Sequence, residues 1–203
     1  MNDRAVEFAY AAAWRVVRAL PERTAHALFR VGADRAAQRG GGGVGRLADN
    51  LRVVVGDQLP EDQFQHLVRD AVRSYARYWC DAFRLPGRTV EQHRTGFTLL
   101  GEEVLVSNTA AGIGTVLGLP HGGNWDAAGA WVASMGMPIT TVAERLRPEG
   151  LYERFVAFRE GLGMEILPLT GGDQPVLDVL TDRLQAGTVV PLLADRDFSR
   201  AGV

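Results

Sequence analysis

Apolar residues recur at helical spacing along the first part of the chain. Their period of three to four residues predicts helices over residues 4–20, 21–38, 44–54 and 62–85. Pro21 ends the first helix, and the run Gly40–Gly43 separates the second from the third. That run lacks the Lys-Ser or Lys-Thr of a phosphate-binding loop and follows no strand, so we expect a flexible connection there.

Two of these helices have a basic face. The first places Tyr10, Trp14 and Val17 opposite Arg15 and Arg18. This pattern is typical of a helix at a membrane interface and equally of a surface helix in a globular domain. The longest helix carries arginines along one edge, which suit lipid or cofactor phosphates or form a solvated face beside acidic residues. These arginines are Arg69, Arg73, Arg77 and Arg84.

From residue 96 onward, short apolar runs alternate with helical segments. We predict strands near 97–100, 113–119, 138–142, 164–168 and 188–193. Helices are predicted between them, near 102–110, 125–135, 148–161 and 174–185. This alternation favours an α/β fold, with a mainly parallel sheet, helices on both faces and right-handed crossovers, preceded by an N-terminal helical segment. We expect a single domain, 1–203, with a helical part at 1–95 and an α/β part at 96–203.

Composition is that of a globular protein with an uneven charge distribution. The chain has 203 residues, of which 46% are hydrophobic and 23% charged, enough to bury a substantial core. All 22 basic residues are arginine. Residues 1–100 hold 15 arginines against 11 acidic residues, a charge of +4, whereas residues 101–203 carry −6. The basic half suits an anionic membrane surface or a solvated face. A sequence pI of about 6.1 without a basic-aromatic module argues against nucleic acid as a partner.

Cysteine and histidine usage argues against a disulfide framework and a metal site. Cys80 is the only cysteine, and it falls in an apolar helix pattern that indicates packing. His66 and His93 have no partner at metal-ligand spacing, so we predict no metal and no cofactor. No apolar run approaches the roughly 20 residues of a membrane-spanning helix, and the first residues lack the form of a signal peptide.

The strongest chemical signal is His121 followed by Asp126, where a predicted strand turns into a helix. Gly122 and Gly123 permit a tight turn, and Asn124 or Gly123 can cap the helix. A neutral imidazole held by a carboxylate can take a proton from an alcohol. No serine or cysteine stands at a nucleophile position, so direct acyl transfer is favoured over a covalent acyl-enzyme. The alternative is a histidine at a helix start with Asp126 as an ordinary first-turn acid.

Glu144 and Arg145 follow the next strand, and so belong at the same carboxyl edge of the sheet. An arginine there suits a phosphate or the coenzyme A of a thioester, with Glu144 holding it in place. A local surface pair is the alternative interpretation, and such a pair contributes little stability.

The run Leu119-Pro120-His121-Gly122-Gly123-Asn124-Trp125-Asp126 resembles the signature of the bacterial lipid A biosynthesis (lauroyl) acyltransferase family, within the lysophospholipid acyltransferase-like superfamily. Gly-Asn-Trp after the histidine is its specific part. Further agreement lies in residues 75–79, 82–86, 141–146 and 167–172. These segments look most like the actinobacterial members that acylate phosphatidylinositol mannosides. The resemblance covers nearly the whole chain.

The resemblance implies a peripheral enzyme at the cytoplasmic face of the cell membrane. It would transfer a fatty acyl chain from acyl-CoA to a sugar hydroxyl of a phosphatidylinositol mannoside. His121 would be the general base, and Asp126, or Asp195 in a block like the family's Asp-x-Asp, would orient it; the sequence does not choose between them. The expected substrate-binding residues are Gly122, Gly123, Asn124, Glu144, Arg145, Arg159 and Arg196.

Alternatives to this function remain open. The acceptor could instead be of the lipid A or lysophospholipid type. Family members usually continue beyond the Asp195 block, so we expect a C-terminally shortened chain, which could be a catalytically silent lipid-binding remnant. A metal hydrolase is disfavoured by the few histidines.

Overall fold

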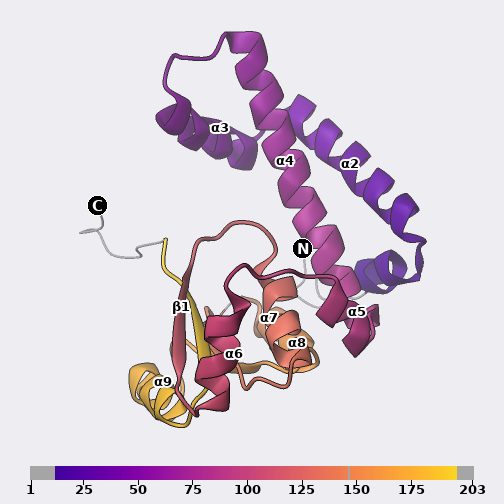
Figure 1. Ribbon diagram of the computed structural model, residues 1–203. Helices are drawn as coiled ribbons and strands as arrows, with labels where there is room; N and C mark the ends of the chain where they lie inside the picture. Colours follow the sequence, from indigo (N-terminus) through magenta and orange to yellow (C-terminus); the bar gives the residue numbers. More distant parts are fainter. Residues whose placement is uncertain (1–11, 146, 196–203) are drawn as a thin grey trace. The chain divides into compact units, whose positions relative to one another are not determined.

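A computed structural model describes residues 12–145 and 147–195 (Figure 1). The chain forms two compact units. Ala11–Arg84 make up the helical unit, and the chain from Leu85 onward makes up the α/β unit. None of the described helices is long and apolar enough to cross a membrane.

The helical unit follows the predicted pattern closely. Residues 12–19 are helical, and α2 (Glu22–Arg39), α3 (Gly42–Val55) and α4 (Glu61–Arg84) come after them. The expectation of a flexible four-glycine connection is wrong in part, because Gly42 and Gly43 belong to α3. Gly40 and Gly41 have φ values of 66° and 119°. These positive angles, which favour glycine, are enough to end one helix and begin the next.

In the helical unit, the start of α2 packs against the last turns of α4. Val17, Ala25 and Cys80 are buried together, and burial raises the pKa of the Cys80 thiol to about 11, as expected for a packed cysteine. Arg84 Nη1 donates hydrogen bonds to the carbonyl oxygens of Val17 (2.8 Å) and Leu20 (2.7 Å). It therefore satisfies carbonyls that the first helix leaves without partners at its end.

The α/β unit alternates helices with short strands. Its elements are the 3₁₀ turn η1 (Leu85–Gly87), α5 (Val90–Thr95), α6 (Glu102–Ala110), β1 (Thr115–Leu119), α7 (Trp125–Ser134), β2 (Thr140–Ala143), α8 (Glu149–Glu160), β3 (Glu165–Pro168), α9 (Val176–Gln185) and β4 (Val189–Leu193). The strand predicted near 97–100 is wrong. Phe97 instead lies against Trp131, with ring centroids 5.6 Å apart, because this segment covers α7 rather than joining the sheet.

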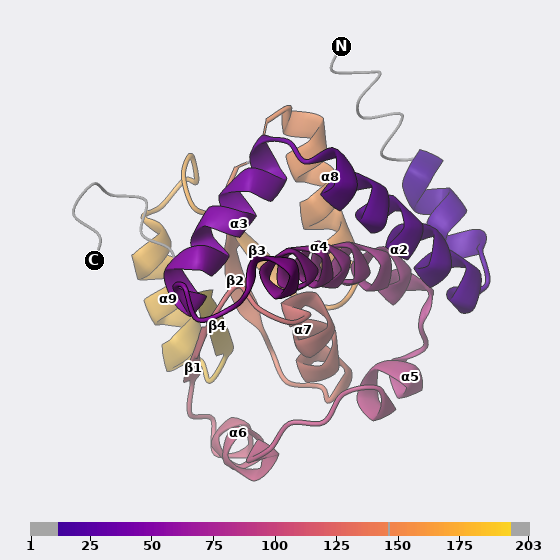
Figure 2. The same cartoon turned by 90° about the horizontal axis from the view of Figure 1, so that it is seen from above.

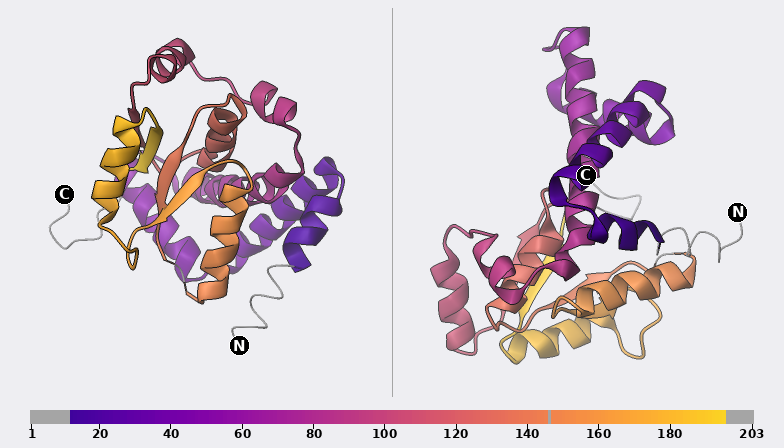
Figure 3. Two further views of the ribbon diagram at one scale, coloured as in Figure 1. Left: turned by 90° about the horizontal axis from the view of Figure 1, so that it is seen from below. Right: turned by 90° about the vertical axis from the view of Figure 1, so that its right-hand side faces the viewer.

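The described strands are all parallel. β1 pairs with β4, and β2 pairs with β3. The two pairs are separate two-stranded sheets, and a single bridge between Ile139 and Val189 sets them side by side in the order β1-β4-β2-β3, which we treat as one sheet. The chain thus moves from β1 to β2 to β3 and returns to β4. Right-handed crossovers then put α7 and α8 on one face and α9 on the other, as Figures 2 and 3 show. The predicted α/β fold, with helices on both faces, is confirmed.

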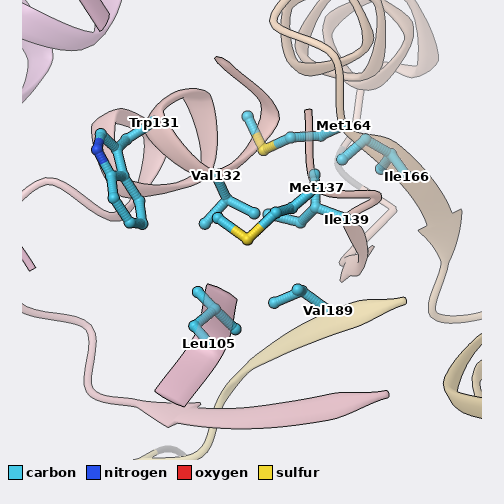
Figure 4. Close-up of a cluster of buried hydrophobic side chains, with 8 residues drawn as sticks. All are labelled: Leu105, Trp131, Val132, Met137, Ile139, Met164, Ile166 and Val189. Atoms are coloured by element: carbon cyan, nitrogen blue, oxygen red, sulfur yellow. The ribbon is translucent and has the colours of Figure 1, made fainter. Parts of the chain in front are cut away.

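A single apolar cluster fixes the strands against α6 and α7. Val189 of β4 is fully buried in it, and Trp131 and Val132 belong to it from α7 (Figure 4). The cluster consists of Leu105, Trp131, Val132, Met137, Ile139, Met164, Ile166 and Val189. Burial of these side chains holds β4 in place. β4 pairs with β1, and the candidate site follows these two strands.

Candidate active site

The strand order brings together two residues that lie far apart in sequence. His121 follows β1, and Asp195 follows β4. Because β1 and β4 are neighbours and parallel, their carboxyl ends share one edge of the sheet. The backbone N–H of Ala194 donates to the carbonyl oxygen of Leu119 (2.9 Å) and extends the pairing one residue beyond β4. Asp195 is thereby placed beside His121.

Asp195 holds His121 through both carboxylate oxygens. Imidazole Nδ1 lies 2.6 Å from Asp195 Oδ1, and the backbone N–H of His121 donates to Oδ2 at 2.9 Å. These hydrogen bonds, the backbone one first, hold the pKa of Asp195 below its ordinary value of 3.8. An ionised carboxylate only accepts hydrogen bonds, so in the neutral imidazole Nδ1 carries the proton and Nε2 has the lone pair. The two side chains are 35% and 41% exposed, and a substrate can reach them.

Asp126 has a different partner. It is 1% exposed in the first turn of α7, and Arg159 Nε donates to its Oδ1 at 2.9 Å. The Arg159 guanidinium also lies over the Trp125 ring, 4.3 Å from its centroid. This arrangement ties the start of α7 to α8. The sequence left two carboxylates open as partners of His121, and Asp195 is the one hydrogen-bonded to its ring.

The turn after His121 leaves some of its backbone N–H groups without an acceptor. Gly122 N–H donates to the carbonyl oxygen of Pro120 (2.8 Å), and Gly123 has a φ of 66°. Asn124 caps α7, because its Oδ1 accepts the N–H of Ala127 at 3.0 Å. Among the described residues, the N–H groups of Gly123 and Asn124 have no backbone acceptor. These two donors of the turn remain for a ligand.

Glu144 and Arg145 are exposed at the end of β2, at the predicted edge. They do not pair with each other. Arg145 bonds instead to Glu149 at the start of α8, with Nη2 2.8 Å from Oε1, and this hydrogen bond lowers the pKa of Glu149. The sequence analysis missed Glu149, although an acid four residues after an arginine was a readable signal.

Arg159 is largely enclosed by its own partners. Its side chain is 13% exposed and is bonded to Asp126, so a substrate meets little of its surface. Arg196, predicted to bind acidic headgroups, lies outside the described residues.

A small apolar cavity adjoins the same strand ends. It measures about 60 Å³ and is lined by Leu119, Trp125 and Leu193 together with other apolar residues of the sheet and α7. Leu119 and Leu193 are the last residues of the strands that lead to His121 and Asp195. An apolar group bound next to His121 would therefore find apolar contacts there.

The described residues of the α/β unit contain no group of three candidate metal ligands. In the helical unit, His26, Cys80 and Asp81 place one ligand atom each within 4.8 Å of one another. His26 Nε2 lies 2.7 Å from Asp81 Oδ1. The Cys80 thiol is buried with a raised pKa, which disfavours the thiolate that a metal requires.

The chain resembles known acyltransferases throughout its length. It is 47% identical over 207 residues to the phosphatidylinositol mannoside acyltransferase of Mycolicibacterium smegmatis, covering 100% of this chain and 66% of the relative. It is 45% identical over 203 residues to that of Mycobacterium tuberculosis, covering 98% of this chain and 63% of the relative. The chain thus spans somewhat less than two thirds of the length of these curated relatives. The sequence model of the family described as bacterial lipid A biosynthesis acyltransferase matches residues 1–203. The chain belongs to this family.

Proposed function

We propose that this chain is an O-acyltransferase that moves a fatty acyl group from acyl-CoA to a sugar hydroxyl of a phosphatidylinositol mannoside, with His121 as general base. The observation that carries the proposal is the pair of hydrogen bonds that the carboxylate of Asp195 accepts from His121. They fix the ring orientation and, in the neutral imidazole, leave the lone pair on Nε2 at an exposed sheet edge. A general base that takes a proton from an alcohol needs both properties.

The reaction proceeds in one displacement. Nε2 of His121 takes the proton of the acceptor hydroxyl while its oxygen attacks the thioester carbonyl carbon. The tetrahedral intermediate collapses, the carbon–sulfur bond breaks, and the coenzyme A thiolate leaves with the proton returned by the imidazolium. Asp195 stabilises that imidazolium because its negative charge lies against Nδ1. The products are an ester and free coenzyme A.

The charge on the carbonyl oxygen also needs a donor. The N–H groups of Gly123 and Asn124 are the candidates in the turn, since Gly122 N–H already bonds to Pro120. The exposed Arg145, and Arg196 beyond the described residues, are candidates to bind the phosphates of coenzyme A or the acceptor headgroup. The apolar cavity beside Leu119 and Leu193 suits part of the acyl group, although its volume fits only a short piece of a fatty chain.

The names of the relatives support the acceptor. Both mycobacterial proteins are called phosphatidylinositol mannoside acyltransferases, and the family name supports acyl transfer to a glycolipid. An acceptor of this kind resides in a membrane. Peripheral attachment at the cytoplasmic face, where anionic lipids attract the arginine-rich first half of the chain, is part of the same proposal.

The test is release of coenzyme A from acyl-CoA by the purified chain, with and without phosphatidylinositol mannosides. We expect acceptor-dependent release that falls about 10²–10⁴-fold in His121→Ala, because the proton acceptor is lost. His93→Ala is the matched control and should keep its turnover, since His93 lies on α5, away from β1 and β4. Equal turnover in His121→Ala and wild type would refute the proposed mechanism.

The family description favours a second acceptor class, namely lipid A precursors. The same assay with a panel of lipid A-type, lysophospholipid and mannoside acceptors separates these possibilities. A folded chain that binds acceptor vesicles but releases no coenzyme A with any of them would instead favour a lipid-binding role without catalysis.

A further inference from the structure

The helical unit contains a basic cavity that the proposed reaction does not use. It lies between α2 and α4, and its volume is about 530 Å³, within the range of roughly 300–1,000 Å³ typical of small-molecule sites. Its lining residues are Arg23, His26, Ala27, Phe29, Arg30, Asp70, Arg73, Ser74 and Arg77. Four of them are arginines and one is acidic.

The lining has the same helical spacing on both sides. From α2 come residues 23, 26, 27, 29 and 30, and from α4 come residues 70, 73, 74 and 77. Apart from Phe29, each set has the spacing i, i+3, i+4, i+7 and therefore forms one stripe along its helix. Apolar side chains normally occupy such stripes where two helices pack. Here each stripe holds two arginines, and the cavity is an open groove along the seam of the two helices, with Arg23, Arg30 and Arg77 exposed.

The arginines differ in their partners. Arg73 donates to Asp34 (2.6 and 3.0 Å) and to Asp70 (3.0 Å), so two carboxylates neutralise it. Arg30 lies one turn before Asp34 and adds to the lowering of its pKa. Within the described chain, Arg23 and Arg77 make no hydrogen bond or ion pair that fixes them.

These partners leave the cavity with an excess of positive charge. Counting the acids bonded to lining residues together with Asp70, three acids (Asp34, Asp70 and Asp81) face four arginines. Arginines held close together repel one another unless an anion lies between them. The guanidinium fork matches the oxygens of a phosphate, and the Ser74 hydroxyl adds a further donor. Ala27 and Phe29 give the cavity an apolar wall, against which the carbon part of an ester can pack.

We propose that this cavity between α2 and α4 binds a phosphate ester with a small organic group, with Arg23 and Arg77 as its principal ligands. The site is separate from His121 and lies wholly within the helical unit. It does not rest on the proposed acyl transfer. The ester can be the headgroup of an anionic phospholipid or a soluble metabolite, since both present the same chemistry.

Calorimetric titration of the full chain distinguishes the two sources. One probe is glycerol phosphate, and the other is vesicles of phosphatidylcholine with and without phosphatidylinositol. In Arg23→Gln/Arg77→Gln we expect binding to weaken by about tenfold or more, because charge-assisted hydrogen bonds are lost. Arg35→Gln/Arg46→Gln removes the same charge from exposed positions of α2 and α3 outside the cavity and should leave binding unchanged.

A second variant guards against loss of the fold. Ser74→Asp keeps all four arginines but puts a negative charge into the cavity, and it should weaken binding as well. Loss of glycerol phosphate binding confined to the cavity variants assigns the site to soluble esters. Loss of phosphatidylinositol-dependent vesicle binding alone assigns it to a lipid headgroup. The proposal would be overturned if wild type bound neither probe, or if binding weakened equally in the cavity variants and the control variant.

Discussion

Asp195 uses both of its oxygens on one residue, His121, and each hydrogen bond has its own effect. The bond to the backbone N–H fixes where the carboxylate sits relative to the end of β1. The bond at Nδ1 sets the tautomer and the ring orientation. A change that keeps the shape of Asp195 but removes its charge therefore tests the second effect with little disturbance of the first.

For Asp195→Asn we expect coenzyme A release to fall by about 10²–10⁴-fold, and the free energy of unfolding to fall only by the small amount that a hydrogen-bonded charge contributes at an exposed site. The amide cannot stabilise the imidazolium, and its NH₂ group can turn the ring into the wrong tautomer. Steady-state turnover, with urea unfolding alongside, measures both quantities. Activity close to wild type in this variant would mean that another carboxylate supports the base.

The pKa of Asp195 leads to a prediction about acid stability. Its folded-state pKa lies below the ordinary 3.8, so the hydrogen bonds to His121 stabilise the fold fully above that pH. Their contribution is lost as the pH falls through the folded-state pKa. We expect the difference in unfolding free energy between wild type and Asp195→Asn to shrink as the pH falls below 3.8. Urea unfolding at a series of pH values measures this difference, and an increase as the pH falls below 3.8 would contradict the prediction.

Substitution of Asp126 should affect stability more than the catalytic step, the reverse of what we expect for Asp195. Its carboxylate is buried against Arg159, and removing one partner of a buried pair leaves an uncompensated charge. We expect Asp126→Ala to lower the free energy of unfolding by about 3–5 kcal/mol. Arg159→Ala should destabilise as well, and the double variant less than the sum of the two. Full stability of Asp126→Ala with abolished turnover would instead return Asp126 to the catalytic group.

At the scale of elements, local pattern predicted most helices and strands, because periodicity depends on neighbouring residues. The prediction failed at 97–100, where apolar residues cover α7 without a partner strand. It missed α5, although Thr89 and Gln92 form a capping box at its start. The choice between Asp126 and Asp195 was out of reach, because it depends on β4 inserting between β1 and β2. That pairing is non-local and leaves no signal in either strand alone.

The start of β1 is tightly packed against the end of α9. A side chain at Gly114 would run into the backbone of Leu184, which cannot move away as a flexible side chain can. We expect Gly114→Ala to destabilise the chain by about 1–3 kcal/mol. Gly118→Ala, within β1 and with open space around it, is the control and should change stability little. Thermal or urea unfolding compares the two, and equal effects would show that the close approach does not matter.

On the scale of the whole chain, the two edge strands of the sheet differ in how well they are protected against pairing with another chain. Among the described strands, β1 and β3 are the edges. β3 ends in Pro168, which has no N–H to offer a further strand. β1 has no proline or charged residue within it, and Val116 is 54% exposed. Such an edge can pair with a second chain, so we expect this chain to self-associate as its concentration rises.

Val116→Lys should reduce that association, because a charge on the edge strand opposes pairing with another copy. The unfolding free energy should change by no more than about 0.5 kcal/mol, as is usual for exposed positions. Val53→Lys adds the same charge at an exposed position of α3 and should leave association unchanged. Sedimentation velocity over a range of concentrations measures the effect. A similar reduction in both variants would point to general charge repulsion, and persistence of association in Val116→Lys would place the contact on another surface.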